Sequence, residues 1–309
     1  MTDTEMRTRT VHPRPDLPLT LAETGPADGR LALVLHGGGG PATVQGVAAH
    51  LAGRHGMRAV VPTHPGWNGT ERPDWFTGVD DLAIAYLHWL RDEGHRDVLV
   101  VGSSLGGWTA AEMAFRDDGA VIGSLVLINA AGVAVPGEPV REIFGLRPDE
   151  IAAYSFHDPA RFAVDPATLT EERIAAQRAN MATLRLLAGD PYMHDPKLLN
   201  RLGRVRIPAL VLWGESDRVV TPAYGRAYAR AFARGRFEPI AEAGHLPHIE
   251  RPEATFAALD AHIDAHIDAH IDAHVDAQAH ATADATTDAK TAARFGATAG
   301  AGSASGQGR

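Results

Sequence analysis

The stretch that decides the fold is residues 98–107, which read VLVVGSSLGG. The apolar, largely β-branched run at its start predicts a buried strand, and residues 108–115 behind it have the composition of a helix. Between the two lies the pattern G-x-S-x-G, which places a serine on a sharp turn from strand to helix. Small neighbours are required there because a Cβ at Gly102 or Gly106 would collide across the turn.

The spacing of this pattern selects Ser104 as the candidate nucleophile. Centring the pattern on Ser103 would require a glycine at Val101. A helix that starts directly behind the Ser104 hydroxyl points its first N–H groups toward negative charge that develops there. The pattern alone is a weak signal in a chain with 32 glycines, and the strand-turn-helix setting is what makes it informative.

Three further strand-like runs each lead into a loop with glycine or polar residues. Residues 31–35 (LALVL) lead into HGGGG, residues 208–213 (PALVLW) lead into GESD, and residues 236–240 (RFEPI) precede EAGHLP. The chain order is therefore a glycine-rich loop, Ser104, Asp217 and His245.

This combination resembles the α/β-hydrolase superfamily, specifically its cap-bearing branch of serine hydrolases. The likeness runs from about Leu17 to Leu259, with four motifs in register. It implies an α/β fold in which a mostly parallel sheet is flanked by helices and carries a helical cap insertion. The alternation of strand and helix patterns as far as Asn129 favours the same architecture.

The resemblance also implies a Ser-His-Asp triad. Asp217, in the context W-G-x-x-D, matches the acid that orients the imidazole. The rival acid position after the preceding strand holds Asn129, which cannot offer a full negative charge. His245, preceded by glycine, matches the base, and His248 is its rival.

The expected mechanism needs no metal and no cofactor. His245 takes the proton of Ser104, and Asp217 holds the imidazole in the required tautomer. The oxyanion is expected to be held by the backbone N–H groups of Leu105 and Gly38. His36, which opens the glycine-rich loop, is expected to hydrogen-bond that loop as a structural residue.

The pattern divides the chain into four segments. Residues 1–16 are expected to be a flexible lead, and residues 17–259 form the hydrolase domain. Within it, residues 133–204 lack a strand pattern and match the family's helical cap, with helices expected at 138–144, 148–154, 171–187 and 196–202. The apolar residues of this segment line a substrate pocket or form the cap's own small core.

From Asp260 the composition changes to a four-residue repeat, Ala-His-Ile-Asp. Residues 260–281 are expected to extend the last helix, and residues 282–309 are expected to be disordered. His262, His266 and His270 would form one slowly turning stripe, because four residues advance about 400° around a helix. Such a stripe can bind a divalent metal, but a solvated extension without a resident metal is the simpler interpretation.

Composition bounds the partners. The 309-residue chain has a net charge of −9, which argues against nucleic acid and anionic membranes. It has no cysteine, so disulfides and thiol nucleophiles are excluded. Residues 1–18 lack the apolar core of a signal peptide, and no run approaches the roughly 18 apolar residues of a membrane span. We expect a cytoplasmic protein with a small-molecule substrate, and a homodimer remains open.

Several reactions fit such a triad. A serine at 104 argues against the dehalogenases and epoxide hydrolases of the superfamily, which use an aspartate. A hydrolase of a small, largely apolar carboxylic ester is favoured. C–C hydrolases of meta-cleavage products typically carry Trp after the catalytic His, whereas this chain has Leu246. Hydroxynitrile lyases and cofactor-free perhydrolases keep the triad, and non-catalytic receptors often lose part of it.

Overall fold

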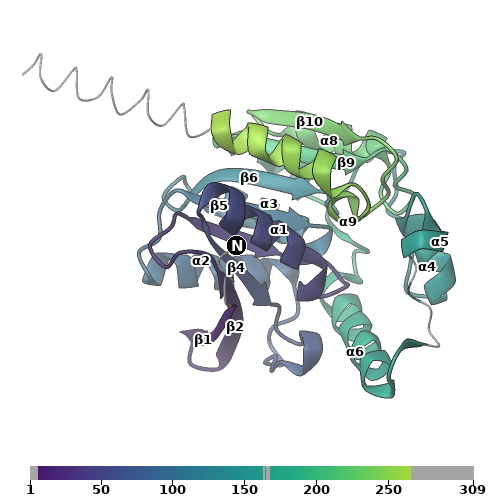
Figure 1. Cartoon of the computed structure of the whole chain (residues 1–309), viewed down its shortest axis with the longest axis horizontal. Coiled ribbons are helices and arrows are strands. Elements are labelled where there is room, and N and C mark those ends of the chain that lie inside the picture. Colours follow the sequence, from purple (N-terminus) through teal and green to yellow (C-terminus); the bar gives the residue numbers. More distant parts are fainter. Residues whose placement is uncertain (1–5, 163, 165–167, 266–309) are drawn as a thin grey trace, which may run out of the picture. The chain divides into compact units, whose positions relative to one another are not determined.

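The centre of the fold is an eight-stranded sheet with the strand order β1-β2-β4-β3-β5-β6-β9-β10 (Figure 1). The computed structural model describes residues 6–162, 164 and 168–265. From β4 to β10 in this order, neighbouring strands pair in parallel. The β1–β2 and β2–β4 pairs are antiparallel. The expected α/β-hydrolase architecture, a mostly parallel sheet flanked by helices, is confirmed.

The strands of this sheet are β1 (Arg7–Arg14), β2 (Leu17–Thr24), β3 (Leu31–Leu35), β4 (Arg58–Thr63), β5 (Val98–Ser103), β6 (Ile122–Ile128), β9 (Ala209–Gly214) and β10 (Gly235–Ile240). The helices around it are α1 (Gln45–His55), α2 (Val79–Asp92), α3 (Leu105–Arg116), α8 (Pro222–Ala231) and the short α9 (Pro247–Glu250). A last helix begins at residue 252, and two 3₁₀ turns, η1 (Pro41–Val44) and η2 (Trp67–Gly69), lie in the connections.

The two faces of the sheet have separate cores. Leu33, Val100 and Val211 belong to a large cluster that includes the apolar faces of α2, α3 and α8. Their strand neighbours point to the opposite face, because side chains alternate along a strand. There α1 packs against β3 and β4. Every residue of β3, β5 and β9 is buried, as expected for strands covered on both faces.

The N-terminal segment corrects one prediction. Residues 7–14, expected to belong to a flexible lead, form β1 and pair with β2, so β2 is not an edge strand. The polar composition concealed β1 because its side chains, on the edge of the sheet, are half-buried or exposed. Residues 1–5 lie outside the described residues.

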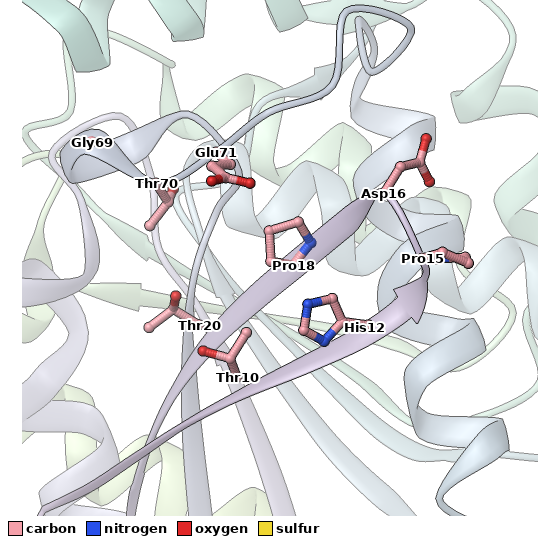
Figure 2. A pocket seen from close by; sticks show the side chains of 9 residues that line it. All are labelled: Thr10, His12, Pro15, Asp16, Pro18, Thr20, Gly69, Thr70 and Glu71. Carbon is pink, nitrogen blue, oxygen red and sulfur yellow. The ribbon is translucent and has the colours of Figure 1, made fainter.

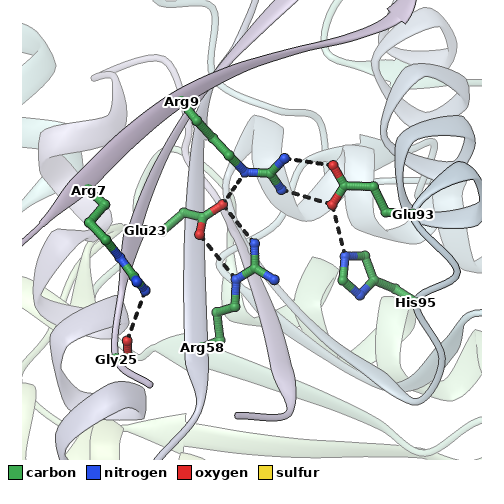
Figure 3. Close-up of polar contacts among 7 residues, drawn as sticks. All are labelled: Arg7, Arg9, Glu23, Gly25, Arg58, Glu93 and His95. Carbon is green, nitrogen blue, oxygen red and sulfur yellow. Dashed lines mark hydrogen bonds and ion pairs between the residues drawn. The ribbon is translucent and has the colours of Figure 1, made fainter. Parts of the chain in front are cut away.

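An ion-pair network ties β1 to the rest of the sheet (Figure 3). Glu23 of β2 accepts from Arg9 Nε at 2.5 Å and from Arg58 Nη2 at 2.9 Å. Arg9 also forms a bidentate pair with Glu93, at 2.7 and 2.8 Å. These contacts join β1, β2 and β4 to the end of α2.

Residues 133–204 contain most of the remaining elements: β7 (Gly132–Val133), α4 (Pro148–Ser155), α5 (Pro159–Phe162), α6 (Glu171–Ala188), β8 (His194–Asp195), α7 (Leu198–Arg201) and η4 (Leu202–Arg204). The helices expected at 148–154 and 171–187 are each present and end one residue later, and α7 replaces the one expected at 196–202. The helix expected at 138–144 is wrong. Its backbone bonds elsewhere: Arg141 N donates to Val219 O at 2.8 Å, and Ile143 N donates to Tyr192 Oη at 3.0 Å.

The C-terminal predictions fall largely outside the described residues. The chain divides into two compact units at Asp260, and residues 261–265 of the second unit are helical. The expected helix over 266–281 and the tail over 282–309 lie outside the described residues. In the part of the chain that is described, no helix combines the length and apolar character that crossing a bilayer requires.

Candidate active site

Ser104 stands on the turn between β5 and α3, in backbone geometry that non-glycine residues rarely adopt. Its φ is 54° and its ψ is −116°. A Cβ built on Gly102 would collide with the carbonyl oxygen of Gly106, and one built on Gly106 would collide with that of Leu35. The predicted collision across the turn is present for Gly102, whereas Gly106 is required because its Cβ would meet the end of β3.

Three strand ends bring the predicted triad residues together. Ser104 follows β5, Asp217 lies in the loop after β9, and His245 lies in the loop after β10. His245 Nε2 is 2.9 Å from Ser104 Oγ, and His245 Nδ1 is 2.8 Å from Asp217 Oδ2. The imidazole thus bridges the hydroxyl and the carboxylate, with one ring nitrogen for each.

The Asp217 carboxylate is buried and fully hydrogen-bonded. Oδ1 accepts from Val219 N at 2.8 Å and from Val220 N at 3.1 Å. Oδ2 accepts from Asn129 Nδ2 at 2.7 Å and faces His245. These donors fix both oxygens, so the carboxylate cannot rotate away from the imidazole without losing hydrogen bonds.

Asn129 has a role that sequence reasoning missed. The sequence presents it only as a position where the acid is absent. In the structure it directly follows β6 with a φ of 44°, a conformation that asparagine tolerates. Its amide donates to Asp217, and its Oδ1 accepts from Gly214 N at 3.2 Å. Asn129 therefore connects the end of β6 to the loop that carries Asp217.

Glu250 is a second residue that sequence reasoning missed. It is buried at the end of α9, and its Oε2 accepts from Gly244 N at 2.5 Å, next to His245. Its Oε1 accepts from His157 N at 2.9 Å and from Asp158 N at 3.2 Å. One carboxylate thus joins the His245 loop to the segment after α4. Nothing in the sequence distinguishes this glutamate from its exposed neighbours.

His248, the rival base, bonds to a different partner. Its Nε2 donates to the carbonyl oxygen of Thr43, in η1, at 3.0 Å, whereas the imidazole that reaches Ser104 Oγ is that of His245. Burial lowers the pKa of His248 to about 4. The geometry therefore favours His245 over His248.

The glycine-rich loop after β3 lies beside the serine. A Cβ built on Gly37 would come within 2.9 Å of Ser104 Cβ. The two N–H groups expected to form an oxyanion hole belong to Gly38, in this loop, and to Leu105, the first residue of α3. Among the described residues, neither N–H donates to a backbone acceptor outside a regular element. The assignment of these two N–H groups to an oxyanion hole stays a prediction.

His36 holds the peptide that carries the Gly38 N–H. Its Nδ1 donates to Gly37 O at 2.7 Å, while its Nε2 accepts from His64 N at 3.1 Å. The C=O and N–H of one trans peptide point in opposite directions, so fixing Gly37 O also fixes the direction of the Gly38 N–H. His36 hydrogen-bonds the loop, as the sequence analysis expected of a structural residue.

A second layer supports His36. His64 Nε2 donates to His36 O at 2.9 Å, and its Nδ1 lies 2.6 Å from Tyr86 Oη. Trp67 Nε1 donates to Gly38 O at 3.1 Å. Burial lowers the pKa of His36 well below its usual value and that of His64 to about 4, so both rings stay neutral near pH 7.

A surface hollow of about 420 Å³ lies elsewhere (Figure 2). It is lined by residues of the β1–β2 hairpin, among them His12 and Asp16, and by residues 69–71. None of the triad residues lines it. The hollow and the triad are therefore separate features of the molecule.

Comparison with known proteins identifies the family that the chain matches. The profile of the alpha/beta hydrolase family matches residues 32–259. The AB hydrolase superfamily protein YisY of Bacillus subtilis is 24% identical over 220 residues, 65% of this chain and 79% of that protein. A 2-hydroxy-6-oxononadienedioate/2-hydroxy-6-oxononatrienedioate hydrolase of Paraburkholderia phymatum is 27% identical over 213 residues, 64% of this chain and 73% of that protein.

A solved structure shows the same fold. A thermophilic esterase from Thermogutta terrifontis superposes with a TM-score of 0.65 at 22% identity, over 85% of this chain and 99% of that one. The family profile covers most of the chain, from within β3 to the last helix. With its sheet order and its serine turn, this chain belongs to the alpha/beta hydrolase family.

Proposed function

We propose that this protein is a serine hydrolase that cleaves a small, largely apolar carboxylic ester, or a related acyl compound, through an acyl-enzyme. One observation carries the proposal: His245 bridges Ser104 Oγ at 2.9 Å and Asp217 Oδ2 at 2.8 Å. This is the arrangement in which an imidazole can take the serine proton while a carboxylate stabilises the resulting positive charge.

The reaction proceeds in two halves. Ser104 Oγ attacks the acyl carbonyl as its proton passes to His245 Nε2. The tetrahedral intermediate collapses, the bond to the alcohol breaks, and His245 returns the proton to the departing oxygen. Water then attacks the acyl-enzyme, with His245 as base, and releases the carboxylic acid and free Ser104. The three triad side chains supply every proton transfer in this scheme.

The oxyanion of the tetrahedral intermediate is assigned to the N–H groups of Leu105 and Gly38. Leu105 is the first residue of α3, so its N–H has no partner within the helix. The Gly38 N–H is aimed by the hydrogen bond from His36 to Gly37 O. Donors that are fixed before the reaction need no reorganisation when charge develops, and removing one typically costs 10²–10³-fold in kcat.

An apolar acyl group is favoured by the surroundings of the glycine loop. A Cβ built on Gly38 would come within 2.9 Å of Leu184 Cδ2, so α6 places an apolar side chain next to this loop. Residues 133–204 thereby act as a cap over the acyl site in this proposal. Leu246, half-buried beside His245, adds a further apolar side chain.

C–C bond hydrolysis of the meta-cleavage-product type is the second candidate. It is favoured by relatives named as 2-hydroxy-6-oxononadienedioate hydrolases. The substrate in that name is a dioate, so it carries two carboxylates and would need cationic partners in the pocket. Leu246, at the position after His245, favours the ester instead.

The two candidates are separated by one set of assays. The purified protein is incubated with p-nitrophenyl esters of graded chain length and, separately, with a vinylogous diketone carboxylate. We expect ester turnover that is abolished in Ser104→Ala and retained in Ser103→Ala. Turnover of the diketone alone would replace the ester with the C–C reaction. If neither compound is turned over in a way that depends on Ser104, the result would point to a lyase, a perhydrolase or a receptor.

A further inference from the structure

Two histidines of α1 and an aspartate of the last helix lie together. His50 Nε2 lies 2.6 Å from Asp260 Oδ1, and His55 Nε2 lies 2.8 Å from the same oxygen. One ligand atom from each of these three residues lies within 4.8 Å of the other two. Among the described residues, this is the group of three histidine, aspartate or glutamate side chains close enough to hold a metal ion. All three residues are half-buried.

We propose that His50 Nε2, His55 Nε2 and Asp260 Oδ1 form a binding site for a first-row transition-metal dication, with Zn²⁺ as the ion it fits best. The site is independent of the proposed hydrolysis, because none of its residues contacts Ser104, Asp217 or His245 in the described hydrogen bonds.

The donor set determines the class of ion. Two imidazoles and one carboxylate are ligands that Zn²⁺ takes at about 2.0–2.2 Å, usually with a fourth ligand such as water. Mg²⁺ and Ca²⁺ prefer oxygen ligands and are not expected to bind here. The ligand atoms must separate from 2.6–2.8 Å to roughly 3.3 Å around a tetrahedral ion, a shift that small side-chain rotations supply.

The proton balance is simple. In the metal-free protein each Nε2 faces the carboxylate and donates to it. To bind the ion, each imidazole presents the Nε2 lone pair and carries its proton on Nδ1.

Two neighbours complete the site. The ring of Phe256 stacks on His50 with centroids 4.3 Å apart, which fixes the orientation of that imidazole. Arg54 Nε lies 3.8 Å from Asp260 Oδ2, the oxygen that the ion does not use. The Arg54 side chain is 65% exposed, so it can turn toward solvent when a cation binds.

An ion held by all three ligands would join α1 to the last helix. His50 and Asp260 are 210 residues apart in the chain, and the unfolded protein cannot present them together. Binding that requires the folded arrangement stabilises the protein by mass action, and the stabilisation grows with the concentration of free ion. The expected signature is therefore a metal-dependent melting temperature.

The test uses the full chain, freed of metal by a chelator, with Zn²⁺ as the probe. Calorimetric titration and thermal unfolding are compared among wild type, His50→Gln, His55→Gln and Asp260→Asn. His12→Gln, an exposed histidine in β1, is the matched control. The histidines at 262–280 supply background binding, so the difference between variants is the measured quantity.

Zn²⁺ is expected to raise the melting temperature of wild type and His12→Gln to the same plateau. Each of the three site variants should lose that rise and at least about tenfold in affinity at one site. Mg²⁺ and Ca²⁺ should produce no rise. The proposal is overturned if wild type shows no Zn²⁺-dependent rise, or if Asp260→Asn and His55→Gln show the full rise. Ester hydrolysis after chelation should be unchanged, which separates this site from the proposed function.

Discussion

The side-chain amide of Asn129 donates to the same Asp217 oxygen that faces His245, at 2.7 Å. A carboxylate in this position must be held in one orientation, because its hydrogen bond selects the tautomer of the imidazole. Asn129 provides that restraint without charge. It therefore supports the acid from the strand position where other arrangements of the triad would place the acid itself.

Substitution of Asn129 should lower kcat with little change in KM. Asn129→Ala removes one donor to Asp217, and we expect a loss of about tenfold in kcat from a less well oriented imidazole, equivalent to about 1.4 kcal/mol. Asn129→Asp should be worse, because a second carboxylate replaces a donor beside Asp217. Steady-state kinetics on an ester separates the two. Wild-type kcat in Asn129→Asp would show that this contact does not position the acid.

Glu250 should matter for both stability and turnover. Glu250→Gln replaces one acceptor oxygen with an amide donor that faces backbone N–H groups, so a buried donor is left without a partner. We expect a loss of about 1–3 kcal/mol in the free energy of unfolding, and a fall in kcat because the His245 loop loosens. Glu253→Gln, at an exposed position three residues along the chain, is the matched control and should change neither. Equal effects from the two variants would contradict this role.

The protein should lose stability as the pH falls from about 6.5 to 4. Burial lowers the pKa of His64 and of His248 to about 4 from an ordinary value of 6.5. Within that window the unfolded chain binds more protons than the folded protein, so the free energy of unfolding declines as pH falls. Each such histidine contributes a slope of about 1.4 kcal/mol per pH unit.

Chemical denaturation across this pH range measures the slope. His248→Gln should flatten it, because one buried group no longer titrates. His12→Gln, whose parent side chain is exposed, should leave it unchanged. A slope in His248→Gln as steep as in wild type would argue against the neutral buried ring.

The edge strand should depend on Glu23. Glu23→Gln removes the charge that faces both Arg9 and Arg58, and we expect a loss of about 2 kcal/mol in the free energy of unfolding. Glu93→Gln, which weakens the more exposed pairs with Arg9 and His95, should cost less than about 1 kcal/mol. Urea titration of both variants gives the comparison. If both variants lose the same free energy of unfolding, the burial of Glu23 adds nothing to the stability of the protein.

The sequence predicts the triad residues better than the residues that hold them in place. Ser104, Asp217 and His245 follow apolar strands, and parallel strands place their carboxyl ends together, so their meeting could be foreseen. Asn129 and Glu250 could not, because a polar residue in a loop carries no sign that it will be buried against a particular partner. Their roles depend on contacts between segments about 90 residues apart.

Two misjudged elements have a related cause. β1 is polar, and its pairing with β2 and the ion pairs of Arg9 stabilise it as a strand. Residues 138–144 have helix-forming side chains, but tertiary hydrogen bonds to Val219 and Tyr192 hold the backbone in an irregular path. Local propensity is a weak guide where such long-range contacts decide the conformation.

The central claim is that Ser104 becomes acylated, and the most direct measurement is the site of acylation. The protein is mixed with a p-nitrophenyl ester, quenched in acid within the first turnovers, digested and analysed by mass spectrometry. The account predicts an added acyl mass on Ser104 in wild type and in Ser103→Ala, and none in Ser104→Ala. An acyl group on Ser103, or an adduct and turnover that persist in Ser104→Ala, would contradict it.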